Sequence, residues 1–300
     1  MITGILCGLT AAILNSVGYL FSAMYLKRCN APFKLLFFAQ TWMLFLSLPF
    51  IWPLFPEQGI ADPKRFITAL IYWVIVFCTG QGSFFLALRN FEASRLSSLL
   101  GLKIIVLTVI YMCVNRSIPN GGQWLAVFMA AAAAMLINYS AGGSWKSRGW
   151  LFVFATLICY SLADINETTL VHCLTESGLS NFRAAFAATS ISYTTLGLLS
   201  LPALFFFKPD KTFVLSFPYA LFWLLSQAAL LACYGLLLPV FGNVILASRG
   251  MFSVLLGAIL AYCGIKGVDA QISRAQWIRR AIAALLMILA IGIYSWAVNR

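Results

Sequence analysis

The chain has 300 residues, of which 62% are hydrophobic and 9% are charged, whereas soluble domains contain about 25% charged residues. This composition excludes a soluble globular domain and indicates an integral membrane protein with little chain outside the bilayer. The net charge of +12 does not indicate a nucleic-acid-binding surface, because lysines and arginines stand singly or in pairs between apolar runs, where they anchor loops at a lipid surface.

Apolar runs long enough to cross a bilayer recur along the whole chain. A span needs about 20 apolar residues. On this basis the sequence predicts ten helices, at residues 2–26, 35–55, 67–88, 96–114, 123–139, 150–171, 184–206, 218–240, 250–265 and 281–298. The first run lacks the basic segment and small-residue cleavage site of a signal peptide, so we expect it to be retained as a helix.

Two pairs of matching fragments stand about half the chain apart. Ala93-Ser94-Arg95 and Gln123-Trp124 recur as Ala247-Ser248-Arg249 and Gln276-Trp277. Each fragment begins an apolar run, which indicates a duplication. Copies with an odd number of helices lie upside down relative to each other, as is typical of secondary transporters. We therefore predict an all-α integral membrane protein with ten transmembrane helices as two inverted five-helix repeats, residues 1–144 and 145–300, in one membrane domain.

Small residues predict one close helix pair. Ala130 to Ala134 lie in the fifth predicted helix, and Ala281, Ala283 and Ala284 lie at the corresponding height of the tenth. Small side chains let helix backbones approach each other closely in lipid. We expect these two helices to pack together.

Three charged residues lie inside the predicted spans: Lys103, Asp164 and Glu167. A charge at the bilayer centre costs about 2.5–3.5 kcal/mol on insertion scales, so each should face a cavity, a partner or the interface. Lys103 could extend to the nearer membrane surface. Alternatively, it could bind a substrate carboxylate or phosphate, or pair with an acid.

Asp164 and Glu167 stand three residues apart and therefore share one face of the sixth predicted helix. One of them could pair with Lys103, and the other could exchange a proton, since burial favours the protonated form of a carboxyl group. Alternatively, Glu167 could lie at the membrane surface. We assign both residues to proton coupling or to an ion pair.

Polar and aromatic side chains on other predicted helices could complete a substrate-binding pocket with Lys103. Gln81 stands between Gly80 and Gly82, which weaken the helix and could bend it where a ligand approaches. Each of these side chains could instead make only a hydrogen bond between helices. The substrate-binding candidates besides Lys103 are Asn15, Tyr19, Gln81, Gln227 and Tyr234.

Several chemistries lack their usual signatures. The eight cysteines form no CxxC pair, and His172 is the only histidine, so we predict neither a metal site nor a cofactor. The chain has no G-x-x-x-x-G-K-[ST] loop and no serine with a plausible histidine partner in a span. We therefore expect a protein that is not an enzyme.

Helix number, the repeated fourth and fifth spans, and short turns together resemble the ten-helix EamA-type branch of the drug/metabolite transporter superfamily. The residues that carry the resemblance are 87–100 and 243–256, which are similar to that family's small-residue start of the fourth helix in each repeat. The resemblance implies a secondary-active transporter in the bacterial cytoplasmic (inner) membrane, working as a monomer. It would export a small metabolite such as an amino acid or related carboxylate by alternating access, and could couple this to protons.

Orientation and some alternatives stay open at this point. The resemblance implies cytoplasmic termini, whereas the loops predicted on the side of the termini carry fewer Lys and Arg than the opposite loops, which favours external termini. The expected partners are a small-molecule substrate, protons and membrane lipids. A passive membrane pore, a lipid-handling protein and, less favoured by the residues, a membrane-embedded enzyme are the other readings.

Overall fold

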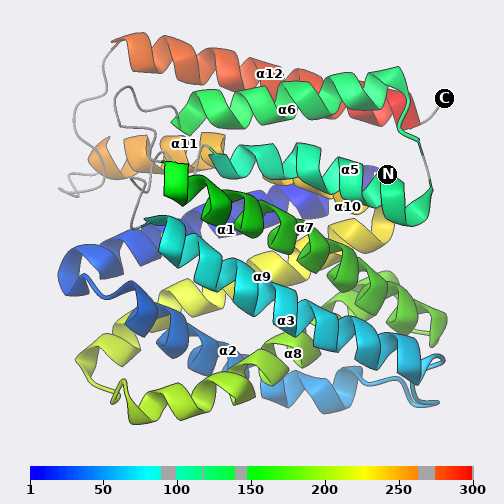
Figure 1. The fold of residues 1–300 in the computed structure, drawn as a ribbon, viewed down its shortest axis with the longest axis vertical. Coiled ribbons are helices and arrows are strands. Elements are labelled where there is room, and N and C mark those ends of the chain that lie inside the picture. The colour runs from blue at the N-terminus through cyan, green and yellow to red at the C-terminus, as the bar shows by residue number, and fades with distance from the viewer. Residues whose placement is uncertain (89–98, 117, 139–146, 263–273, 299–300) are drawn as a thin grey trace.

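A computed structural model describes residues 1–88, 99–116, 118–138, 147–262 and 274–298 (Figure 1). These residues form helices joined by short turns, and no strand occurs among them. The repeated fragment Ala93-Ser94-Arg95 lies outside the described residues. The helices are α1 (Ile2–Cys29), α2 (Pro32–Leu54), α3 (Pro63–Leu88), η1 (Leu100–Leu102), α5 (Lys103–Asn115), α6 (Gly121–Asn138), α7 (Ser147–Glu176), α8 (Asn181–Ser200), η2 (Leu201–Phe205), α9 (Lys211–Leu236), α10 (Pro239–Leu246), α11 (Arg249–Tyr262) and α12 (Arg274–Val298).

Seven helices of the described chain are long and apolar enough to cross a membrane: α1, α2, α3, α7, α8 with η2, α9 and α12. Two shorter apolar helices span residues 100–114 and 121–136. The prediction of an all-α membrane protein is confirmed at this level. The chain is a multi-pass helical protein with long apolar spans.

Helices from the two halves of the chain lie side by side in the bundle. The most extensive pairs are α1 with α9, α3 with α7, α6 with α12, and α2 with α8 (Figure 1). The predicted packing of the fifth and tenth helices is confirmed, because Ala130 and Ala133 of α6 share an apolar cluster with Ala283 and Met287 of α12. Short side chains bring these two helices close together.

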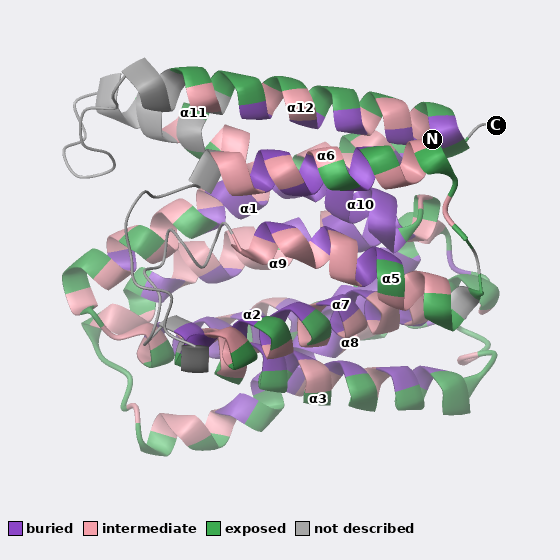
Figure 2. Cartoon of the chain, turned by 45° about the horizontal axis from the view of Figure 1, so that its top comes forward, coloured by how far each residue is buried: buried purple, intermediate pink, exposed green. Residues whose placement is uncertain are grey.

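The eighth and ninth predicted spans have different bounds in the structure. The apolar run 218–240 passes through the end of α9, and Leu237 and Leu238 have extended backbone. Proline lacks an N–H and disfavours helix at the residue before it, so Pro239 begins a new helix. The resulting α10 has eight residues and is buried along its whole length (Figure 2). A turn at Ala247 and Ser248 then leads into α11.

Candidate functional site

An ion pair lies between the helices of the bundle. The Lys103 ammonium is 2.7 Å from Asp164 Oδ2, with 17% and 8% of the two side chains exposed. The Asn243 amide donates to the same Asp164 oxygen at 2.6 Å and contacts the Tyr234 hydroxyl at 2.7 Å. We call Lys103, Asp164, Tyr234 and Asn243 the Asp164 cluster. It joins α5, α7, α9 and α10, so each member comes from a different helix.

Local structure positions each member of the Asp164 cluster. Lys103 begins α5 directly after η1, where Gly101 allows close packing because an added Cβ would lie 2.7 Å from Ala134 Cβ. Asn243 is held by its own short helix, since its amide also donates to the Pro239 carbonyl at 2.9 Å. An amide nitrogen carries two hydrogens. It therefore divides two hydrogens among three acceptors, which fixes its orientation toward Asp164.

The pairing accounts for two of the three charges predicted inside the spans. Removing both charges from water costs several kcal/mol per ion, and the attraction of the pair and its extra hydrogen bond offset that cost. The Lys103 ammonium is bound to Asp164, and pairing with an acid is one of the alternatives that the sequence left open for Lys103.

Glu167 is the other acid on this face of α7. It is buried, with 4% of its surface exposed. Among the described residues it makes no ion pair. Its carboxyl group is in electrostatic range of Asp164 and Lys103 and lies near the Trp73 indole, whose N–H makes no hydrogen bond in the described part of the chain. Glu167 is thus the unpaired acid beside the Asp164 cluster.

A series of aromatic rings begins at Lys103. The Lys103 ammonium lies 6.0 Å from the Tyr160 ring centre. Tyr160 is 6.4 Å from Phe77, and Phe77 is 6.4 Å from Tyr193. The Tyr193 hydroxyl in turn accepts a hydrogen bond of 3.0 Å from the Trp223 indole. The rings connect α7, α3, α8 and α9 through direct contacts.

The same series ends at a second basic residue. Trp223 packs edge-on against Tyr19, with ring centres 6.0 Å apart, and lies 5.7 Å from Tyr219. The Arg249 guanidinium carbon lies 5.5 Å from the Tyr19 ring centre. This distance allows a cation–π interaction. Two cations, Lys103 and Arg249, therefore lie against rings of one connected aromatic cluster.

The structure brings some predicted site residues together and leaves others apart. Tyr234 joins Lys103 and Asp164 through Asn243, and Tyr19 contacts Arg249. Hydrogen bonds among the described residues do not connect the other predicted side chains to the Asp164 cluster. These are Asn15, which is 1% exposed with an Oδ1 atom lacking a partner there, the buried Gln227 and the half-buried Gln81.

The Gly80-Gln81-Gly82 triplet does not interrupt α3, which continues to Leu88. A Cβ added at Gly80 would lie 2.8 Å from the Tyr160 ring, whereas one added at Gly82 would meet nothing within 4 Å. Gly80 therefore allows α3 to approach the aromatic ring that faces Lys103. Its role here is close packing.

Two residues of the site were not predicted as candidates. Asn243 and Arg249 lie between the eighth and ninth predicted spans, in a segment that follows Pro239 and contains Gly242 and the Ala-Ser-Arg fragment. The spacing of four residues from Pro239 to Asn243 was the available signal, because it places both on one face of a helix begun by proline. Within the described ranges, no three His, Cys, Asp or Glu side chains gather as metal ligands.

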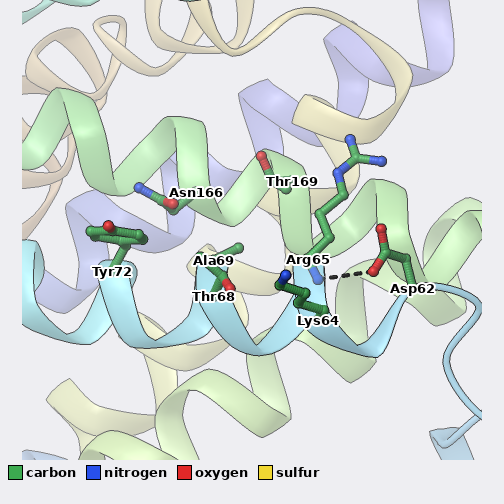
Figure 3. Close-up of a pocket in the computed structure, with 8 residues that line it drawn as sticks. All are labelled: Asp62, Lys64, Arg65, Thr68, Ala69, Tyr72, Asn166 and Thr169. Atoms are coloured by element: carbon green, nitrogen blue, oxygen red, sulfur yellow. Dashed lines mark hydrogen bonds between the residues drawn. The ribbon is translucent and has the colours of Figure 1, made fainter.

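An open groove of about 440 Å³, lined by several polar residues, lies between α3 and α7 (Figure 3). Its α7 residues are satisfied within their own helix, since the Asn166 amide donates to the Leu162 carbonyl at 2.8 Å and the Thr169 hydroxyl to the Ile165 carbonyl at 3.0 Å. Asn166 is about 200° around α7 from Asp164, so the groove and the Asp164 cluster lie on different faces. The groove is lined by Asp62, Lys64, Arg65, Thr68, Ala69, Tyr72, Asn166 and Thr169.

Comparison with known proteins adds information on the fold. No family model matches the chain, and no curated protein matches it. Chains of solved structures do match, 28 in number. One of them, described as "Crystal structure of protein", aligns over 99% of this chain and 98% of its own, with a TM-score of 0.67 and 14% identity. At this identity the likeness shows a shared fold over the whole length.

Proposed function

We propose that this protein is a secondary-active transporter that exports a small anionic metabolite, such as an amino acid or related carboxylate, by alternating access. The observation that carries the proposal is the buried Lys103–Asp164 ion pair with Glu167 beside it. Ionisable residues among membrane-spanning helices are costly and usually mark the path of a substrate or a proton. An apolar pair of similar volume would often stabilise a bundle as well or better.

The pairing of helices supports ten spans in two inverted repeats. If α7 in the second half corresponds to α1, and α9 to α3, then the pair α1 with α9 corresponds to the pair α7 with α3. In the same scheme α2 corresponds to α8 and α6 to α12, so each of these two pairs joins a helix with its own counterpart. All four are the most extensive pairs of the bundle. In this scheme, η1 with α5 forms the fourth span, and α10 with α11 forms the ninth as a broken helix, a feature of many transporter binding sites.

In the proposed cycle, Lys103 releases the Asp164 carboxylate and binds the carboxylate of the substrate instead. A proton binding to Asp164 removes the negative charge that holds Lys103, and the ammonium can then bind the substrate carboxylate. Departure of the substrate and of the proton restores the ion pair. Glu167, one turn along α7, is placed to pass this proton. The two five-helix repeats would move against each other around this point.

The test is untargeted metabolite profiling of cells and medium. The strains carry the native chain, Lys103→Ala, Asp164→Asn or an empty vector, with the variants at matched membrane abundance. We expect at least one anionic compound to move into the medium with the native chain only. Lys64→Ala is the matched control, because it removes an exposed lysine and should leave export unchanged. Export by Lys103→Ala equal to that by the native chain would contradict the assigned role, and no moving compound would contradict the transporter proposal.

Concentrative movement separates this proposal from a passive pore. In proteoliposomes, a carrier coupled to protons should accumulate the identified compound against its gradient when a pH difference is imposed. A pore would only bring the compound to equal concentrations. Conversion of the compound to a product in detergent, without two compartments, would indicate an enzyme.

A further inference from the structure

Arg249 differs from Lys103 in having no counter-charge. It is half-buried at the start of α11, and no carboxylate pairs with its guanidinium in the described part of the chain. Its contact there is with the face of Tyr19. Lys103, in contrast, is already neutralised by Asp164 in this conformation. Of the two cations beside the aromatic cluster, Arg249 is therefore the one ready to receive an anion.

The backbone around Arg249 is fixed against α1. The Ser16 hydroxyl is 2.8 Å from the Arg249 carbonyl and 2.7 Å from the Ala12 carbonyl. Tyr19 follows Ser16 by three residues, so both lie on the same face of α1. Thus one helix holds the arginine backbone and also supplies the ring beneath its guanidinium. A site held in this way binds with little loss of conformational freedom.

The neighbouring rings offer accessible aromatic surface. Tyr19 is 38% exposed, and Tyr219 and Trp223 are partly accessible. Trp223 is held at 86° to Tyr19 and by its hydrogen bond to Tyr193. Aromatic rings attract a further ring in edge-on or offset stacked geometry. An arginine beside such rings fits a ligand that has a carboxylate at one end and a ring at the other.

We propose that Arg249, Tyr19 and Trp223 form a binding site for an aromatic carboxylate in the conformation described here, where Asp164 still holds Lys103, and that this is the substrate class of the transporter. The inference rests on the proposed function. A guanidinium binds a carboxylate through two parallel hydrogen bonds, and the ring of the ligand packs on Tyr19 and Trp223. A small inorganic anion would pair with the Arg249 guanidinium but would make no contact with the rings. The ligand then lies against the same aromatic cluster that Lys103 contacts.

The test is equilibrium dialysis of radiolabelled phenylacetate against the purified full-length chain in detergent. We expect saturable binding that excess unlabelled phenylacetate displaces, while acetate and inorganic phosphate compete at least tenfold less well. Cyclohexylacetate, which has the charge without an aromatic ring, should fall between them. Absence of phenylacetate binding to the native chain, or equal competition by acetate or phosphate, would overturn the proposal.

Variants distinguish the effect of Arg249 on binding from the effect of removing any positive charge. Arg249→Gln should weaken phenylacetate binding at least tenfold, Arg249→Lys should weaken it less, and Trp223→Leu should reduce the advantage of phenylacetate over acetate. Arg28→Gln is the matched control, because it removes an exposed arginine from α1, and it should bind as the native chain does. Gel filtration checks that each variant is folded. Unchanged binding in Arg249→Gln would overturn the site even where the other variants misfold.

The two proposals fail in different ways. Arg249-dependent phenylacetate binding without any exported compound would leave this site standing and would contradict the transporter. Export of a non-aromatic compound that is unaffected by Arg249→Gln would leave the transporter standing and would contradict this site.

Discussion

At the scale of single residues, Asp164 depends on donors from two other helices. Its Oδ2 atom receives both the Lys103 ammonium and the Asn243 amide within 2.7 Å. Such a pair holds helices in register only while both charges are present, because the loss of one leaves the other buried and unpaired. Each of the two charges is thus stabilised by the presence of the other.

A double-mutant cycle measures this dependence. Lys103→Met should lower the free energy of unfolding by about 3–5 kcal/mol, the usual effect of breaking a buried pair, and Asp164→Leu should do the same. The combined variant should recover much of the loss, because no unpaired charge remains. Reversible unfolding in mixed detergent provides the measurement. The control is Lys34→Met, which breaks an exposed pair and should change stability far less. Additive losses in the double variant would show that the two side chains do not act as a pair.

At the scale of helices, close approach depends on a few glycines. A Cβ added at Gly197 of α8 would lie 2.5 Å from Leu44 Cβ and 3.0 Å from the Gln40 carbonyl oxygen of α2. These atoms belong to or adjoin the backbone and cannot move aside without shifting a helix. The two helices are therefore in close contact at Gly197, with no room there for a larger residue.

We expect Gly197→Ala to destabilise the protein in a thermal unfolding measurement in detergent, because α8 must move away from α2. Gly82→Ala is the matched control, since nothing lies within 4 Å of an added Cβ there. It should be neutral or should stabilise by up to about 1 kcal/mol, the helix propensity difference between alanine and glycine. A lower melting temperature for Gly82→Ala than for Gly197→Ala would contradict the packing described here.

The start of α9 is tied to α2 by an exposed pair. The Lys34 ammonium, 2.6 Å from Asp210 Oδ2, and the Thr212 side chain hold the pKa of the Asp210 carboxyl at about 2, below its usual 3.8. Because the folded-state pKa is the lower one, this stabilisation is present above about pH 4 and is lost as the pH falls from about 4 to 2. Asp210 also caps α9, since it accepts the Thr212 N–H at 2.9 Å.

Asp210→Asn isolates the charge, because asparagine is also a good helix cap. We expect the native chain to melt at a higher temperature than Asp210→Asn at pH 6, and this difference to vanish near pH 2. Melting in detergent at a series of pH values provides the measurement, with high salt as a further check on an exposed pair. A difference that stays constant down to pH 2 would show that the pair with Lys34 does not contribute.

The sequence predicted the long helices well and their interruptions poorly. Runs of about 20 apolar residues have one stable form in a bilayer, so α1, α2, α3 and α7 lie close to their predicted positions. The eighth predicted span ran on to residue 240, past the end of α9, because Leu236, Leu237 and Leu238 continue the apolar run. Hydropathy does not register a change in backbone direction.

The predicted site followed a similar pattern. The spans contain three charged residues, and the free-energy cost of an unpaired charge in the bilayer is enough to predict that Lys103 pairs with an acid. The choice of Asp164 over Glu167 could not be predicted, because residues three apart share a face and the difference depends on which one α5 and α10 approach. Arg249 and Asn243 depend on how the α10–α11 break folds back into the bundle. That packing is tertiary information, which the spacing of residues does not contain.

At the scale of the whole molecule, the position of the two ends limits the number of membrane crossings. Figure 1 places both termini at the same end of the bundle, the Ser295 hydroxyl is 3.5 Å from Met1 Sδ, and the Asn120 amide donates to the Ala297 carbonyl at 2.8 Å. A chain that begins and ends on one side of a membrane crosses it an even number of times. The seven long helices alone would give an odd number, whereas the ten spans proposed above, in which the shorter helices also cross, give an even one.

Reporter fusions that are active on one side of the membrane test this deduction. Fusions after Arg300 and after Gln58 should report the same side as a fusion before Met1, whereas a fusion after Pro209 should report the opposite side. In the ten-span scheme two crossings (α1 and α2) separate Met1 from Gln58, and five (α3, α5, α6, α7 and α8) separate Gln58 from Pro209. Ten crossings require this pattern of reporter results. The side that the two terminal fusions share also shows whether the termini are internal or external. Opposite results for the two termini would leave an odd number of crossings and would exclude two five-helix repeats. Agreement would make the α10–α11 break part of a crossing helix, which would place Asn243 and Arg249 inside the membrane with the groups they contact.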